Sequence, residues 1–104
     1  MRDLKLRPAE QEIVLNILRE YVPELDVWAF GSRVHGENLK PFSDLDLVIV
    51  TESPLDAGRM AELKEAFTES DLPFKVDVLD WSTTGERFRQ VIKKNYVVVQ
   101  KGEE

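Results

Sequence analysis

The order in which helix-like and strand-like segments follow one another is the feature of this sequence that most constrains its fold. Residues 9–22 place Ile13 and Ile17 four apart with Leu18 beside them, which is the spacing of an amphipathic helix. Two further helices are expected at 56–70 and after residue 83, and four strands at 25–30, 44–50, 74–80 and 96–100. This α-β-β-α-β-α-β order predicts an α+β fold, a small mixed β-sheet with helices mainly on one face.

The last helix carries its own start signal. Thr83 and Glu86 have the spacing of a capping box, in which each side chain pairs with the main chain of the other. The helix that follows is expected to bury Phe88, Val91 and Ile92.

The length and composition set the class of protein. A chain of 104 residues predicts one domain, residues 1–104, with a single core. Its residues are 42% hydrophobic and 33% charged, which is typical of a soluble globular protein. No apolar run approaches the roughly 20 residues that span a bilayer. The N-terminus lacks the apolar core of a signal peptide, so we expect a cytoplasmic protein with no membrane contact.

The reactive residue types exclude several chemistries. The absence of cysteine excludes disulfides, thiolate catalysis and cysteine metal sites, and one histidine excludes a multi-histidine zinc site within the chain. A net charge of −6 argues against direct nucleic acid binding, which needs a positive surface. It does not exclude a small phosphate ligand that arrives with magnesium, because the metal supplies positive charge locally.

The strand at 44–50 begins with two acids one residue apart. Side chains alternate along a strand, so Asp44 and Asp46 are expected on one face, roughly 6.6 Å apart along the backbone, with Leu45, Leu47 and Ile49 on the other. Magnesium prefers such hard oxygen ligands together with waters and substrate phosphates. The pair therefore suggests a magnesium–nucleotide site. The alternative is a solvated strand edge or a turn acid without a ligand.

A Gly-Ser-Arg turn ends the preceding strand. Gly31 permits close approach of the backbone to a ligand, Ser32 can donate a hydroxyl hydrogen bond, and Arg33 offers a charged fork for phosphate oxygens. Main-chain N–H groups at such a turn, leading into a helical segment, also favour phosphate. The alternative is a plain turn in which Arg33 pairs with a nearby acid such as Glu37. Sequential strands are neighbours about two-thirds of the time, so the turn and the two acids are expected to meet.

A third acid lies inside a later strand pattern. Asp77 stands between Val76 and Val78, and an unpaired charge in a buried strand is costly. Proximity to a metal would explain it, since two-metal phosphoryl transfer uses a further acid. The alternative is that Asp77 faces solvent together with Lys75. Asp80 fits a strand end or a turn.

Together these residues resemble a known family. The stretch GSRVHGENLKPFSDLDLVIV, residues 31–50, looks like the signature of the DNA polymerase β-type nucleotidyltransferase superfamily, with Gly-Ser, a loop, and Asp-x-Asp opening an apolar strand. Asp77 matches the later strand acid, and the small size most resembles the minimal nucleotidyltransferases, or MNT proteins, of bacteria and archaea. The specific signature lies in residues 30–50, whereas the element order matches over nearly the whole chain.

The resemblance implies a palm-like nucleotidyltransferase domain that binds magnesium, with two ions expected, and ATP as substrate. Asp44, Asp46 and Asp77 would be the catalytic, metal-binding acids, Gly31 and Ser32 would hold the triphosphate, and Arg33 would be an accessory phosphate contact. Many MNT proteins are antitoxins partnered by an all-helical HEPN toxin, and some transfer AMP to a tyrosine of that toxin. The resemblance therefore implies a hetero-oligomer with a small HEPN-type protein.

Two competing functions remain open from the sequence. We expect no second domain with which to recognise tRNA, DNA or an aminoglycoside, and the sequence has no basic run in its place, so another protein is expected to complete the acceptor site. The first alternative is a non-catalytic antitoxin that neutralises its partner by contact. The second is an aminoglycoside-type nucleotidyltransferase that needs a companion subunit.

Overall fold

The structure, a computed structural model, describes residues 4–36 and 39–103. Its elements are α1 (Pro8–Tyr21), β1 (Asp26–Phe30), α2 (Ser32–His35), β2 (Leu45–Val50), α3 (Ala57–Thr68), β3 (Val76–Asp80), the 3₁₀ helix η1 (Trp81–Thr83), α4 (Glu86–Lys94) and β4 (Val97–Gln100). The predicted order of the longer elements is confirmed, with the short α2 and η1 added. Within the described ranges, no helix combines the length and the apolar character that crossing a membrane requires.

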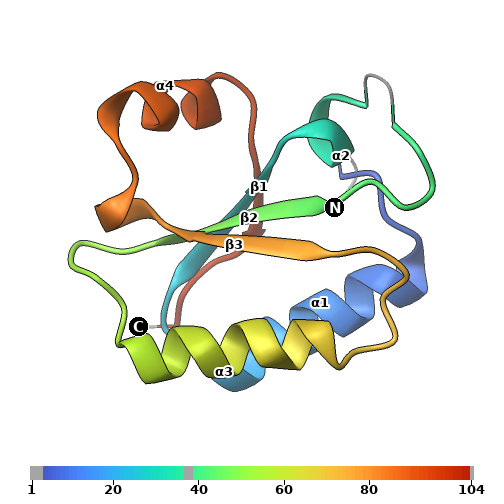
Figure 1. The fold of residues 1–104 in the computed structure, drawn as a ribbon, viewed down its shortest axis with the longest axis horizontal. Helices are drawn as coiled ribbons and strands as arrows, with labels where there is room; N and C mark the ends of the chain where they lie inside the picture. The colour runs from blue at the N-terminus through green and yellow to red at the C-terminus, as the bar shows by residue number, and fades with distance from the viewer. Residues whose placement is uncertain (1–3, 37–38, 104) are drawn as a thin grey trace.

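The four strands form one mixed sheet in the order β3-β2-β1-β4. β1 pairs antiparallel with β2 and β4, whereas β2 and β3 run parallel. Figure 1 shows α1 and α3 together on one side of the sheet and α4 on the other. The α+β class, the mixed sheet and the two long helices on one face agree with the expectation from the sequence. β3 is an edge strand, so one of its sides is not paired with another strand.

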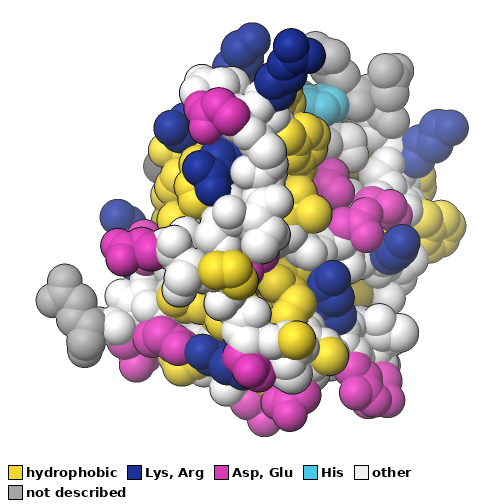
Figure 2. Space-filling view, turned by 60° about the vertical axis from the view of Figure 1, so that its left-hand side comes forward, with side chains coloured by type: hydrophobic (Ala, Val, Ile, Leu, Met, Phe, Trp, Pro, Cys, Tyr) yellow, Lys and Arg dark blue, Asp and Glu magenta, His cyan; other side chains and the backbone are white. Residues whose placement is uncertain are grey.

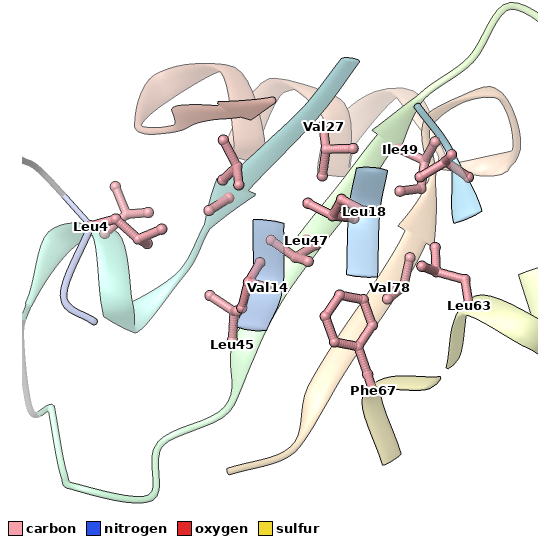
Figure 3. Close-up of a cluster of buried hydrophobic side chains, with 14 of the residues drawn as sticks. Leu4, Val14, Leu18, Val27, Leu45, Leu47, Ile49, Leu63, Phe67 and Val78 are labelled. Carbon is pink, nitrogen blue, oxygen red and sulfur yellow. The ribbon is translucent and has the colours of Figure 1, made fainter. Parts of the chain in front are cut away.

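The main core lies between the sheet and the helices α1 and α3. Leu45, Leu47 and Ile49 alternate along β2 and are fully buried on this side, as predicted. Figure 3 shows them packed with side chains of both helices, among them Leu18 of α1 and Phe67 of α3. Each such side chain contributes about 1.5–3 kcal/mol through burial, so this face supplies most of the stability of the fold.

The opposite face of the sheet has a smaller core under α4. Ile92 is fully buried against Phe30 and Val48, with Trp28 and Trp81 packed beside them. The predicted burial of the rest of this helical face is wrong.

Phe88 and Val91 of α4 are 43% and 55% exposed. The physical reason is that α4 has only nine residues and contacts the sheet along a narrow stripe. Helical spacing shows which residues share a side of the helix, but it does not show how much sheet lies below that side.

The junction between β3 and α4 is organised by Asp80 rather than by a capping box. The N-cap of α4 is Gly85, so the capping box predicted from Thr83 and Glu86 is wrong. Thr83 instead lies in η1, and its hydroxyl donates to the main-chain oxygen of Asp80.

The Asp80 carboxylate accepts hydrogen bonds from Thr51 Oγ1, from Leu55 N–H, and from the N–H and hydroxyl of Ser82. Burial would raise the pKa of Asp80, but these hydrogen bonds outweigh it and hold the pKa below its usual value. Asp80 is therefore a strand-end residue, as expected, and it joins the loop before α3 to the turn that leads into α4.

Candidate functional site

Two of the predicted acids lie opposite each other on neighbouring strands. Asp46 of β2 pairs in register with Asp77 of β3, and on its other side with Phe30 of β1. Both acids lie on the face of the sheet that α4 covers incompletely, since the residues that alternate with them on β2 fill the main core. The parallel pairing of β2 with β3 therefore brings together two carboxylates that are 31 positions apart in the sequence.

Asp44 completes the group of acids at longer range. It lies just before β2 and is exposed to solvent. The sequence predicted that the strand begins at Asp44, but it begins one residue later, at Leu45. Burial, followed by the negative charges of Asp77 and Asp44, raises the pKa of Asp46 to about 6. The three predicted acids thus share one electrostatic environment, in which Asp46 is the central and most buried member.

The glycine turn lies directly against the central acid. Gly31 follows β1 with φ of 83°, a backbone conformation that favours glycine. A Cβ added at Gly31 would meet Asp46 Oδ2 at 2.3 Å, so any larger residue would displace this carboxylate. Ser32 is the next residue and begins α2. The sequence prediction that the turn and the acids meet is therefore confirmed for Gly31 and Asp46.

Arg33 is buried, and its guanidinium faces the main chain. It donates hydrogen bonds to the carbonyl oxygens of Lys5 at 2.9 Å, Pro41 at 3.0 Å and Ser43 at 2.8 Å. The guanidinium also stacks 3.9 Å from the centre of the Phe74 ring. Arg33 thus supports the loop that enters β2.

These contacts differ from the two roles considered for Arg33 from the sequence. The pairing with Glu37 lies outside the described residues. The phosphate contact of Arg33 stays a prediction, and the observed hydrogen bonds give this side chain a structural role.

A pocket of about 570 Å³ opens beside the two paired acids at the β3 edge of the sheet. The charged residues that line it are Asp46, Asp77, Lys64 of α3 and Lys75, which precedes β3. Lys75 Nζ lies 3.5 Å from Asp77 Oδ1, and the Asp77 side chain is 43% exposed. Asp77 therefore faces solvent together with Lys75, as the alternative held, and its role as a metal ligand beside Asp46 stays a prediction.

The apolar part of this pocket contains two aromatic residues beside Val76, Val78 and Leu79. Phe30 of β1 and Phe88 of α4 line it, with their rings edge to face at 5.7 Å between centroids. Sequence reasoning missed Lys64 and Phe88 as site residues. Lys64 carried no signal, because nothing in its position on a helix shows that it lies beside a strand edge. The helical spacing of Phe88 was interpreted as evidence that this side chain is buried in the core.

The acids present fit a divalent cation of the magnesium type. Among residues 4–36 and 39–103, no three acidic or histidine side chains are grouped closely enough to hold a metal ion as they stand. Magnesium does not need three, since it usually takes one or two carboxylates and completes its octahedron with waters and substrate phosphates. Asp46 and Asp77 offer hard oxygen ligands from adjacent strands, and a cation between them would offset the burial and the repulsion that raise the pKa of Asp46.

Comparison with known proteins assigns the family. A family model described as the nucleotidyltransferase domain matches residues 12–100. The chain belongs to this family. The matched region includes the turn at Gly31 and all three candidate acids, so the site described above lies within the family domain.

A curated relative gives a closer match. The chain is 55% identical, over 100 residues, to a protein of Haemophilus influenzae described as a probable protein adenylyltransferase MntA. The match covers 96% of this chain and 87% of the relative. The resemblance to the minimal nucleotidyltransferases is thereby confirmed.

Solved structures show the same fold. One, a toxin–antitoxin complex with AMP-PNP, aligns with a TM-score of 0.71 at 22% identity and covers 89% of this chain and 74% of that chain. A second, the tri-AMPylated HEPN toxin of Shewanella oneidensis in complex with its MNT antitoxin, aligns with a TM-score of 0.64 at 20% identity and covers 88% and 69%. At this identity the likeness establishes a shared nucleotidyltransferase fold.

Proposed function

We propose that the chain is a single minimal nucleotidyltransferase domain, an antitoxin that transfers AMP from magnesium-bound ATP to a tyrosine hydroxyl of an all-helical HEPN-type partner. The observation that carries the proposal is the registered pair Asp46 and Asp77 with the main chain of Gly31 against it. The 55% identity to a probable protein adenylyltransferase supports the choice of a protein as the acceptor.

The residues divide into two groups in this proposal. The ligands for magnesium are Asp44, Asp46 and Asp77. Asp46 lies between Phe30 of β1 and Asp77 of β3. Gly31 and Ser32 hold the triphosphate on the β1 side of Asp46, where the glycine permits close approach. Arg33 supports the intervening loop through its three carbonyl contacts, and its accessory contact with phosphate stays a prediction.

The reaction is a displacement at the α-phosphorus of ATP. The acceptor oxygen forms a bond to that phosphorus, and the bond from phosphorus to the oxygen that bridges to the β-phosphate breaks, so pyrophosphate leaves with the electron pair. Asp77, which is the more exposed of the paired acids, accepts the proton of the acceptor hydroxyl. Magnesium, when bound, neutralises charge on the phosphates and makes the acceptor hydroxyl more acidic. The protein otherwise acts by positioning the reactants.

The test uses the chain produced together with an all-helical HEPN-type protein. With α-labelled ATP and magnesium, we expect label on the partner, and we expect it to disappear in a variant carrying both Asp44→Asn and Asp46→Asn. Tight association without label, unaffected by these substitutions, would instead establish neutralisation by contact. Label on an added aminoglycoside would establish a small-molecule transferase.

A further inference from the structure

We infer that the pocket at the β3 edge is the acceptor subsite, and that it takes a tyrosine side chain from a protein segment that carries an acidic residue next to that tyrosine. The lining of this acceptor pocket includes Phe30, Phe88, Lys64, Lys75, Asp46 and Asp77. The inference rests on the proposed function and adds where the acceptor binds and what chemistry selects it.

The direction of approach follows from the strand order. Gly31 ends β1 and lies against Asp46 on one side, whereas Asp77 of β3 lies on the other. In phosphoryl transfer, the attacking and leaving oxygens lie roughly in line on opposite sides of the phosphorus. With the leaving pyrophosphate held towards Gly31, the acceptor oxygen must come from the β3 side. β3 is the edge strand, and the acceptor pocket opens there.

The apolar part of the acceptor pocket suits an aromatic ring. Phe30 and Phe88 present an edge-to-face pair, and Phe88 keeps 43% of its surface exposed. A phenol ring placed against such a pair gains burial and a favourable aromatic contact, while its hydroxyl stays at the polar end beside Asp77. A volume of about 570 Å³ accommodates a tyrosine side chain and part of its neighbours.

The charges of the acceptor pocket suit an acidic neighbour. Once Asp46 and Asp77 are engaged with a cation, the remaining charged residues among the described lining are Lys64 and Lys75. They come from α3 and from the start of β3. A carboxylate next to the acceptor tyrosine would lie against this positive pair.

The helix that carries Phe88 continues the positive surface. α4 has four basic residues, Arg87, Arg89, Lys93 and Lys94, against the single acid Glu86, whereas the whole chain has a net charge of −6. Figure 2 shows basic side chains in dark blue beside yellow apolar surface at the top of the molecule, where α4 lies. An acidic partner surface is therefore complementary to the rim of the acceptor pocket, although it would be repelled by most of the remaining surface.

Charge reversal on the rim separates acceptor binding from nucleotide binding. Lys64→Glu is expected to raise the KM for the co-produced HEPN-type partner about 5-fold, a typical effect of one surface charge pair, with kcat nearly unchanged. The affinity for magnesium-bound α,β-methylene-ATP, which cannot release its AMP group, is expected to stay the same in calorimetry. Lys101→Glu, the same charge change after β4 at the far edge of the sheet, is the matched control and should change neither value.

A second variant tests the aromatic lining. Phe88→Ala is expected to raise the acceptor KM about 10-fold, because an aromatic contact of about 1.5 kcal/mol is lost, again without weakening the nucleotide complex. Circular dichroism and thermal unfolding confirm that the variant is folded. Replacing the acid nearest the modified tyrosine by lysine should impair wild-type transfer and be rescued by Lys64→Glu.

Three outcomes would overturn the inference. A loss of nucleotide affinity in Lys64→Glu with an unchanged acceptor KM would assign the lysine to ATP phosphates. Unchanged KM values in both Lys64→Glu and Phe88→Ala would move the acceptor elsewhere while leaving the proposed function intact. Absence of any AMP transfer by the wild-type pair would refute the proposed function, and this inference with it.

Discussion

The two faces of the sheet are covered to different extents. Under α1 and α3, the side chains of Leu47 and Ile49 are fully buried in a core built from both helices. Under α4, the side chains of Val48 and Ile92 are fully buried, while Phe88 and Val91 of α4 remain exposed. The first face stabilises the fold, and the second leaves part of the sheet accessible.

The difference explains where the candidate site can lie. We call the face under α1 and α3 the closed face and the face under α4 the open face. A carboxylate on the closed face would be buried without water or a partner, which is costly. On the open face, Asp46 is partly buried and Asp77 remains accessible, so a cation can reach both carboxylates. Incomplete cover by α4 is thus a condition for chemistry at the site. The burial on the closed face compensates for the stability that the open face lacks.

The largest expected effect separates activity from stability on the open face. Asp46→Asn should reduce AMP transfer by more than about 100-fold, since even groups that only support metal ligands cost 10–100-fold when removed. The free energy of unfolding should not fall, because the substitution removes a partly buried charge that Asp77 and Asp44 repel. Label transfer and urea unfolding measure the two quantities. A clear loss of stability would show that Asp46 holds the fold together and would break the contrast.

The closed face should show the reverse behaviour. Leu47→Ala is expected to lower the free energy of unfolding by about 3 kcal/mol, through lost burial and a cavity in the main core. Denaturant unfolding followed by circular dichroism gives this value. The nucleotide affinity of the folded fraction should be retained, since Leu47 faces away from Asp46. A cost below about 1 kcal/mol would mean that this face is less tightly packed than its burial indicates.

A substitution at Asp80 tests the junction between the two faces, and its effect on the free energy of unfolding is expected to depend on pH. The pKa of Asp80 is lowered on folding, so its contribution is present above the unfolded value of about 3.9 and is lost as the pH falls through the folded value. Asp80→Ala should therefore cost about 2 kcal/mol at neutral pH, where its charged hydrogen bonds are made, and less in acid.

The measurement is urea unfolding of the wild type and Asp80→Ala at pH 7 and near pH 3. The two stability curves should converge at the lower pH. An equal difference at both values would show that Asp80 acts through packing alone.

The smallest expected effect lies on the outer side of α4. Val91→Ser should change the free energy of unfolding of the isolated chain by less than about 0.5 kcal/mol, because Val91 is already more than half exposed. Chemical denaturation measures the change. A cost of several times this size would indicate that α4 packs more closely on the sheet than its exposure shows.

The expectations for the closed face and for the open face were met unequally, for one physical reason. Alternation along a strand places Leu45, Leu47 and Ile49 on a single side whatever the neighbours are, and the structure has them so. Helical spacing likewise placed Phe88 near Ile92, but burial depends on the extent of the opposing surface, so Phe88 and Val91 were predicted wrongly.

The candidate site divides in the same manner. The type of residue at Asp46 and its glycine neighbour in the signature were visible in the sequence, because both belong to one short stretch. The hydrogen bonds of Arg33 to three main-chain oxygens were not, since they depend on where loops from two regions come to lie. The pocket lining by Lys64 was hidden for the same reason.

The sequence by itself determined the order of helices and strands, the side of β2 that faces the main core, and which acids are candidates for a metal site. These features are local, because they follow from the periodicity of the chain and the chemistry of its side chains. Only the tertiary structure decided that β3 lies parallel to β2 with Asp77 opposite Asp46, and that α4 leaves the edge beside them open. Strand register and helix cover are set by packing between distant segments, which periodicity within one segment does not encode.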